Sequence, residues 1–267
     1  MPGYPNEYKL NKAEHRCYTE QGFLIRESQF GKTEIERLRA AAQRVTTRAL
    51  QLAKEGSEYR LDDKRFVDKD NHTIQFEFDD DQQIRVIEPI HTLDRDIDAL
   101  VDDPRLSEPM RSILGRRDIA LWTGKMNLKS GHGSGFDWHQ DSPYWIHDSS
   151  HVDLLPNVMV TLNEQSDTNG CFRVIAGSHL RGLLPGRSDG SQLAGFYTDD
   201  AQFDLNQEVR FSVPAGSLIF FDPHIVHGSR PNETVNPRNA MIFTYQPSGF
   251  PLLKTGEIRN VLNHQAR

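Results

Sequence analysis

His139 and Asp141 lie one residue apart in the stretch FDWHQDSPYW. Since residues i and i+2 of a β-strand point to the same side, these two side chains could bind one metal ion at a strand end. A mononuclear iron(II) site needs two imidazoles and one carboxylate on one face of the metal, with the remaining positions open. The distant segment PAGSLIFFDPHIVHGSRPN offers a second imidazole, from either His224 or His227.

The chain contains a second pair with this spacing, His151 and Asp153, which follows His147. An H-x-D pattern alone is a weak indication of a metal site, because short motifs often occur by chance. The second pair lies among serines just before the run Leu-Leu-Pro, which favours a solvated turn. His179, in GSHLRG, is interpreted as a structural histidine that forms hydrogen bonds near a turn.

The N-terminal part of the chain has a mainly helical pattern. Apolar residues recur every three or four positions over 33–55, which predicts an amphipathic helix. Thr33 and Glu36 have the spacing of a capping box, and Gly56 is a suitable stop. We also expect a short helix over 11–21 that ends at Gly22, a strand FLIRE after it, and a helical segment over 93–114 that breaks at Pro104.

The charged segment 57–84 has only weak periodicity, so we predict a mobile loop that could cover a site, with a short hairpin at 73–78. After Gly115 the pattern changes to short apolar runs separated by turn residues. A helical start followed by many short strands predicts a mainly β fold, a double-stranded β-helix or cupin-like jelly-roll barrel with the N-terminal α-helices packed on it. The predicted strands are 119–128, 157–163, 171–176, 209–213, 217–221 and 240–246.

Length and composition limit the class of protein. We expect one domain over 1–267, with helical support and a loop (1–115), a jelly-roll core (116–250) and a C-terminal tail (251–267). The net charge is −7 and the 31 Lys and Arg are scattered among 38 Asp and Glu, which disfavours nucleic acid as a partner. No run approaches the roughly 18 apolar residues of a membrane helix, and no signal peptide is evident, so a cytoplasmic protein is expected. Cys17 and Cys171 lack metal-binding spacing and are expected to be reduced and buried.

Several motifs in a fixed order give a resemblance to a known family. They are EQGFLIRES, LWTGKMNLKSGHGSGFDWHQDSPYW, TNGCFRVIAGSHL and PAGSLIFFDPHIVHGSRPNETVNPRNAMIFTYQP, which together span most of the chain. The sequence resembles the phytanoyl-CoA dioxygenase family of iron(II)/2-oxoglutarate oxygenases, which includes ectoine hydroxylase. By that similarity, His139, Asp141 and His227 are the ligands of Fe(II).

The resemblance also implies where 2-oxoglutarate binds. The family pattern places a serine two residues after the distal histidine and an arginine eleven after it, which fits Ser229 and Arg238 and selects His227 as the ligand. The Arg238 guanidinium, helped by Ser229, would hold the far carboxylate of the co-substrate, because its fork of donors matches a carboxylate. Asn127 matches a family asparagine beside the co-substrate, or only caps the next turn. Trp145 matches a tryptophan near the metal, or is a plain core aromatic.

The implied reaction is hydroxylation of an unactivated carbon, coupled to decarboxylation of 2-oxoglutarate to succinate and CO2 with O2 as the second co-substrate. Related halogenases replace the carboxylate ligand, so the presence of Asp141 favours hydroxylation. The same iron site could instead run desaturation, epimerisation or cyclisation of a natural-product intermediate. A non-catalytic cupin-like protein that binds a small molecule or metal is the other alternative, although it has no need for Arg238 and Ser229 at these offsets.

The substrate is less defined by the sequence. Ectoine hydroxylase has serine between its ligands, followed by Phe-Glu-Thr-Trp-His, whereas this chain has Gln140 and then SPYWI, which departs from the ectoine signature. We expect a small polar metabolite, amino-acid-like or a natural-product intermediate, and a monomer or homodimer. The candidate substrate-facing residues are Lys125, Thr123, Tyr144 and parts of 57–84.

Overall fold

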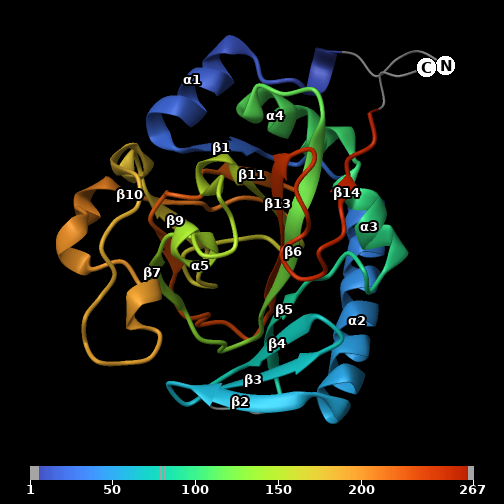
Figure 1. Ribbon diagram of the computed structural model, residues 1–267, viewed down its shortest axis with the longest axis vertical. Helices are drawn as coiled ribbons and strands as arrows, with labels where there is room; N and C mark the ends of the chain where they lie inside the picture. Colours follow the sequence, from blue (N-terminus) through green and yellow to red (C-terminus); the bar gives the residue numbers. More distant parts are fainter. Residues whose placement is uncertain (1–5, 79, 81, 264–267) are drawn as a thin grey trace.

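The computed structural model describes residues 6–78, 80 and 82–263, and its strands form two antiparallel sheets (Figure 1). The long apolar strands β13 and β6 pair along their whole length at the centre of the larger sheet. In spatial order, this sheet contains β1 (Phe23–Arg26), β11 (Leu218–Phe221), β8 (Asn157–Thr161), β13 (Arg238–Pro247), β6 (Ile119–Lys129), β5 (Ile84–Glu88), β4 (His72–Phe76), β3 (Lys64–Lys69) and β2 (Ser57–Leu61), with β14 (Arg259–Asn260) also paired to β6.

The smaller sheet consists of β10 (Glu208–Arg210), β9 (Phe172–Ile175), β12 (His227–Ser229) and β7 (Phe136–His139), in that order. Buried side chains from both sheets meet in one cluster, with Phe172 of β9 against Met159, Phe221 and Ile242 of the larger sheet. This face-to-face packing is the jelly-roll barrel expected from the sequence, and the predicted fold class is confirmed.

Helices pack on the outside of the larger sheet (Figure 1). The break expected at Pro104 is confirmed: proline opens a new helix there, where its missing N–H costs no hydrogen bond. The helices are α1 (Lys12–Gln21), α2 (Lys32–Glu55), α3 (Arg95–Val101), α4 (Pro104–Leu114) and α5 (Ser142–Trp145), with 3-10 turns η1 (Asn6–Tyr8), η2 (Val152–Leu154), η3 (Ser178–Arg181), η4 (Ala194–Phe196), η5 (Asp200–Gln202) and η6 (Leu205–Gln207).

None of the helices within the described residues is both long and apolar enough to cross a membrane. Both cysteines are free, but only Cys171 is buried and Cys17 is half-buried. The capping box predicted for Thr33 and Glu36 is wrong, because the helix starts one residue before Thr33. The Glu34 carboxylate instead accepts the N–H of Gly31 at 2.9 Å.

The prediction of a mobile loop over 57–84 is also wrong. This segment forms β2, β3 and β4, which extend the larger sheet beyond β5. Val67 and Ile74 are paired in register and fully buried, while the charged neighbours point outward. Asp70 and Asn71 both have positive φ and form the tight turn between β3 and β4. β4 pairs with β3 on one side and with β5 on the other. The chain therefore does not fold back on itself within 73–76, where a hairpin was expected.

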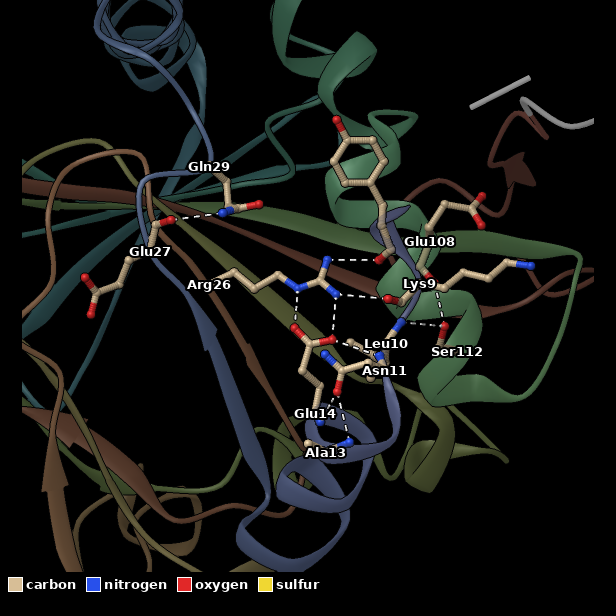
Figure 2. Close-up of polar contacts among 11 residues, drawn as sticks. Lys9, Leu10, Asn11, Ala13, Glu14, Arg26, Glu27, Gln29, Glu108 and Ser112 are labelled. Carbon is tan, nitrogen blue, oxygen red and sulfur yellow. Dashed lines mark hydrogen bonds and ion pairs between the residues drawn. The ribbon is translucent and has the colours of Figure 1, made fainter. Parts of the chain in front are cut away.

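Arg26 of β1 ties the N-terminal elements to the barrel (Figure 2). Its guanidinium makes two hydrogen bonds of 2.9 Å to the carboxylate of Glu14 in α1. The same group donates to the carbonyls of Tyr8 and Lys9, at 2.9 and 3.1 Å. Asn11 caps α1 by accepting the N–H groups of residues 13 and 14. Four donors of one side chain therefore position η1, the helix start and the strand.

Candidate active site

His139, Asp141 and His227 converge at the end of the smaller sheet. His139 is the last residue of β7, and His227, the first of β12, lies directly opposite it in the antiparallel pair. The two imidazole rings are 4.1 Å apart between centroids. One ligand atom from each of the three residues lies within 4.8 Å of the others. The expectation that H-x-D ends a strand is met only for His139, because Asp141 lies beyond the strand as the N-cap residue of α5. The distances still suit one metal ion.

Both histidines have the protonation state that a metal requires. His139 Nδ1 lies 2.7 Å from the carbonyl oxygen of Asp137, and His227 Nδ1 lies 3.0 Å from that of Ile225. Because a carbonyl only accepts, each Nδ1 carries the hydrogen and each Nε2 keeps its lone pair. Burial, together with His227, lowers the pKa of His139 to about 3, and burial also lowers the pKa of His227. Neutral imidazoles are the ligand form.

Asp141 is held by donors on both of its oxygens. Lys125 Nζ lies 2.8 Å from Oδ1, and Asn157 Nδ2 lies 3.0 Å from Oδ2. Asn157 in turn accepts the hydroxyl of Thr244 at 2.6 Å. Burial alone would raise the pKa of Asp141, but Lys125 and the two histidines outweigh it and lower the pKa to about 2. The group is therefore an ionised, oriented carboxylate at neutral pH.

The alternative histidine, His224, is already fully engaged. Its Nδ1 lies 2.9 Å from the Ser142 hydroxyl and its Nε2 lies 2.7 Å from Oδ1 of Asp153. The two residues of the second H-x-D pair therefore make separate structural contacts. Asp153 contacts His224, and His151 Nε2 lies 3.1 Å from the Gln246 side chain. Over the part of the chain that the structure describes, no other three such side chains converge as a metal site would require.

The three residues line a cavity of about 560 Å³, and Arg238 and Ser229 line it too. Arg238 begins β13 and is 2% exposed. Its Nη2 donates to the carbonyl of Gly170 at 2.6 Å, while its Nε has no partner among the described residues. Burial lowers the pKa of Arg238 only to about 10, so it stays charged at neutral pH. A buried guanidinium with a spare donor fits a carboxylate ligand.

Two basic residues near Arg238 were missed by the sequence analysis. Lys129 lies opposite Arg238 in register, and its buried side-chain nitrogen donates to the Ser229 hydroxyl at 2.7 Å and contacts the carbonyls of Gly170 and Arg230. Burial, then the charge of Arg238, lower its pKa to about 5. Arg85 lies with its guanidinium 3.9 Å from the centre of the Phe136 ring and lines the cavity. The sequence feature that could have identified both residues is a basic residue within an otherwise apolar strand.

The remaining candidates take different positions. Asn127 lines the cavity from the interior of β6, which continues to Lys129, so it does not cap the following turn. Trp145 packs with Trp122 in a buried cluster and also lines the cavity, which combines both expected roles. Tyr144 lines it as well. Thr123 is not among the lining residues; it is buried, and its hydroxyl donates to Glu88 at 2.7 Å.

The fold and this site together define a non-haem iron dioxygenase that depends on 2-oxoglutarate. The chain belongs to the phytanoyl-CoA dioxygenase family, whose model matches residues 18–240, as the sequence motifs indicated. The ectoine dioxygenase of Streptomyces avermitilis is 29% identical over 254 residues, which cover 88% of this chain and 78% of that protein.

Solved structures agree with the fold. EctD from S. alaskensis, with 2-oxoglutarate and 5-hydroxyectoine, has a TM-score of 0.72 at 20% identity. The match covers 99% of this chain and 89% of the EctD chain. The alpha-ketoglutarate-dependent carbocyclase SnoK from nogalamycin biosynthesis has a TM-score of 0.70 at 17% identity, over 98% of this chain and 100% of its own. At these identities the likeness concerns the jelly-roll architecture.

Proposed function

We propose that the protein hydroxylates an unactivated carbon of a small molecule while 2-oxoglutarate is decarboxylated to succinate and CO2. The observation that carries this proposal is that one cavity joins two different sets of groups. His139, Asp141 and His227 form a cluster suited to iron(II), and the buried Arg238 with Ser229 offers unused donors suited to a carboxylate. A protein that only bound a metal would need the first set alone.

The metal centre would use the Nε2 atoms of His139 and His227 and one oxygen of Asp141. Bound iron would supply activation of O2 for oxidation of the keto acid and the substrate. The rings of Phe172 and Phe221 each lie 5.2 Å from that of His227 and restrict water around it. The carboxylate of Asp141 would fill a coordination position that halogenases leave free, which supports hydroxylation.

The second carboxylate of 2-oxoglutarate would bind Arg238. The planar guanidinium presents parallel N–H donors, and Arg238 uses Nη2 for the Gly170 carbonyl while its Nε has no partner among the described residues. Ser229 already accepts a hydrogen bond from Lys129, so its own hydroxyl hydrogen is available for the ligand. We also propose a cytosolic location and, given the net charge of −7, no nucleic-acid partner.

The test is an anaerobic titration of iron(II) and 2-oxoglutarate into the apo-protein, recording the weak visible charge-transfer band of a chelated keto acid. The wild type should develop the band, and His227→Ala should not. Arg238→Ala should need roughly 10–100-fold more 2-oxoglutarate, because it loses a charge-assisted pair. Arg210→Ala, which removes a surface arginine outside the cavity, is the matched control and should titrate like the wild type.

Succinate release in air is the second measurement. Iron-dependent release that is lost in His227→Ala would support turnover at this site. A wild-type protein that binds iron(II) but develops no band at any concentration of 2-oxoglutarate would contradict the proposal and favour the metal-binding alternative.

A further inference from the structure

The cavity is larger than its metal centre and co-substrate require. A short dicarboxylic acid between the metal ligands and Arg238 occupies only the inner part of a space of about 560 Å³. Pockets of roughly 300–1,000 Å³ accommodate drug-sized ligands. A compact amino acid in the remaining space would leave much of the wall without contact, which costs the dispersion energy of a packed interface.

Aromatic side chains surround the opening of this cavity. Tyr59, Phe78 and Tyr144 all line it, and they are 37, 40 and 40% exposed, which places them at its mouth. Tyr144 stacks on Phe196 with centroids 4.5 Å apart and an interplanar angle of 12°, and both rings line the cavity. Exposed aromatic groups gathered at one opening indicate a binding surface, and flat ring faces bind other planar rings well.

The two sides of the mouth are tied together. The β2–β3 hairpin carries Tyr59, and Phe196 belongs to η4. Asp62, in the hairpin turn, accepts the backbone N–H groups of Gln192 and Leu193, both at 2.7 Å. The aromatic walls therefore have a defined separation, and the mouth can select for the shape of its ligand.

The cavity wall carries both signs of charge, since Glu88 and Asp137 line it together with basic residues. Lys64 and Lys254 line the cavity, and among the described residues neither has a carboxylate partner. The Lys64 ammonium contacts the Tyr197 hydroxyl, and the Lys254 ammonium lies 3.0 Å from the Thr73 hydroxyl. In contrast, the lining carboxylate of Asp137 is paired with Arg187 at 3.2 Å. Two ammonium groups with only neutral partners favour an anionic ligand.

We propose that the substrate is a planar molecule of several fused or linked rings that carries an acidic group. The rings lie against the aromatic walls near Tyr144, the acidic group binds one of the two ammonium groups, Lys64 or Lys254, and the reacting carbon points toward the metal ligands. This inference rests on the proposed function, since the same cavity must also hold 2-oxoglutarate. The inference favours a natural-product intermediate over an amino-acid-like metabolite as the substrate.

The test uses the protein loaded anaerobically with iron(II) and saturating 2-oxoglutarate, so that Arg238 is occupied. Three probes are titrated by calorimetry: anthracene-2-carboxylate, its uncharged amide, and proline. The ring acid should bind at least about ten-fold more tightly than its amide, and proline should bind most weakly. The double variant Lys64→Met/Lys254→Met should remove the preference for the acid. Lys54→Met, on the exposed surface of α2, is the charge-matched control and should retain it.

Tyr144→Leu should weaken binding of both ring probes by a similar factor, which separates the stacking contribution from the charge contribution. The inference is overturned if proline binds as tightly as the ring acid, or if acid and amide bind equally to the wild type. The keto-acid band is recorded for every variant. A normal band without ring binding contradicts this inference alone, whereas a wild type without the band contradicts the proposed function as well.

Discussion

The Asn157 amide donates a hydrogen bond of 3.0 Å to one carboxylate oxygen of Asp141. Lys125 donates to the other oxygen, so both oxygens have a protein donor. Asn157 comes from β8 in the larger sheet, and Asp141 follows β7 in the smaller one. The bond therefore fixes the proposed metal ligand Asp141 of one sheet against the other. Thr244 on β13 orients the Asn157 amide from behind.

Replacing Asn157 should weaken the metal site without removing a ligand. We expect Asn157→Leu to lower iron(II) affinity by roughly 10–100-fold, since groups that orient ligands contribute on that scale. Thr244→Val should have a smaller effect, because the amide stays but loses its orienting partner. Anaerobic iron(II) titration with circular dichroism as a folding control measures both. If Asn157→Leu bound iron(II) as tightly as the wild type, the hydrogen bond from Asn157 to Asp141 would not be needed for metal binding.

Lys129 should affect co-substrate binding through Ser229. Lys129→Met keeps the volume but loses the hydrogen bond to the Ser229 hydroxyl, so we expect 2-oxoglutarate to bind about ten-fold more weakly. The thermal midpoint should not fall, because a buried amine is costly to desolvate. Adding Ser229→Ala to this variant should change affinity little further, as in a double-mutant cycle of coupled groups. Additive losses would contradict the coupling.

The sequence predicted the elements whose apolar pattern is strong. The helix over 33–55 and the strands around the barrel centre were recognised because burial sets their periodicity. The strands within 57–84 were missed, since charged outward residues hide the inward pair Val67 and Ile74. The convergence of His139, Asp141 and His227 was predicted from H-x-D and the family offsets, but the place of Lys129 was not. Its role depends on pairing with Arg238, more than a hundred residues away, which no local pattern contains.

Arg26 should contribute more to stability than a surface arginine. Arg26→Ala removes four hydrogen bonds to Glu14, Tyr8 and Lys9, and we expect it to lower the free energy of unfolding by about 2–3 kcal/mol. Arg26→Lys should recover only part of this loss, because an ammonium cannot reproduce the fork. The control is Arg210→Ala, because the Arg210 side chain is itself exposed and its ion pairs with Asp167 and Glu208 are each worth less than about 1 kcal/mol. Urea denaturation measures the free energy of unfolding of the three variants. Equal losses for Arg26→Ala and Arg210→Ala would contradict the larger contribution of Arg26.

His91 should make the fold sensitive to mild acid. It is buried, its Nδ1 has no partner among the described residues, and burial, aided by Arg259 and His72 and opposed by Asp98, lowers its pKa to about 4. The unfolded chain binds this proton below about pH 6.5, whereas the folded protein binds it only near pH 4. Stability is therefore complete above pH 6.5 and falls as the pH drops toward 4, by about 3 kcal/mol for this group.

His91→Phe should remove that part of the pH dependence. Urea midpoints measured between pH 7 and pH 4.5 should fall less steeply in the variant than in the wild type, because the unfolded state no longer gains a proton at this position. His147→Phe is the matched control, since His147 is exposed and its replacement should leave the slope of the wild type. Parallel pH profiles for His91→Phe and the wild type would show that the buried imidazole is protonated in the folded protein without cost, and that the acid sensitivity originates elsewhere.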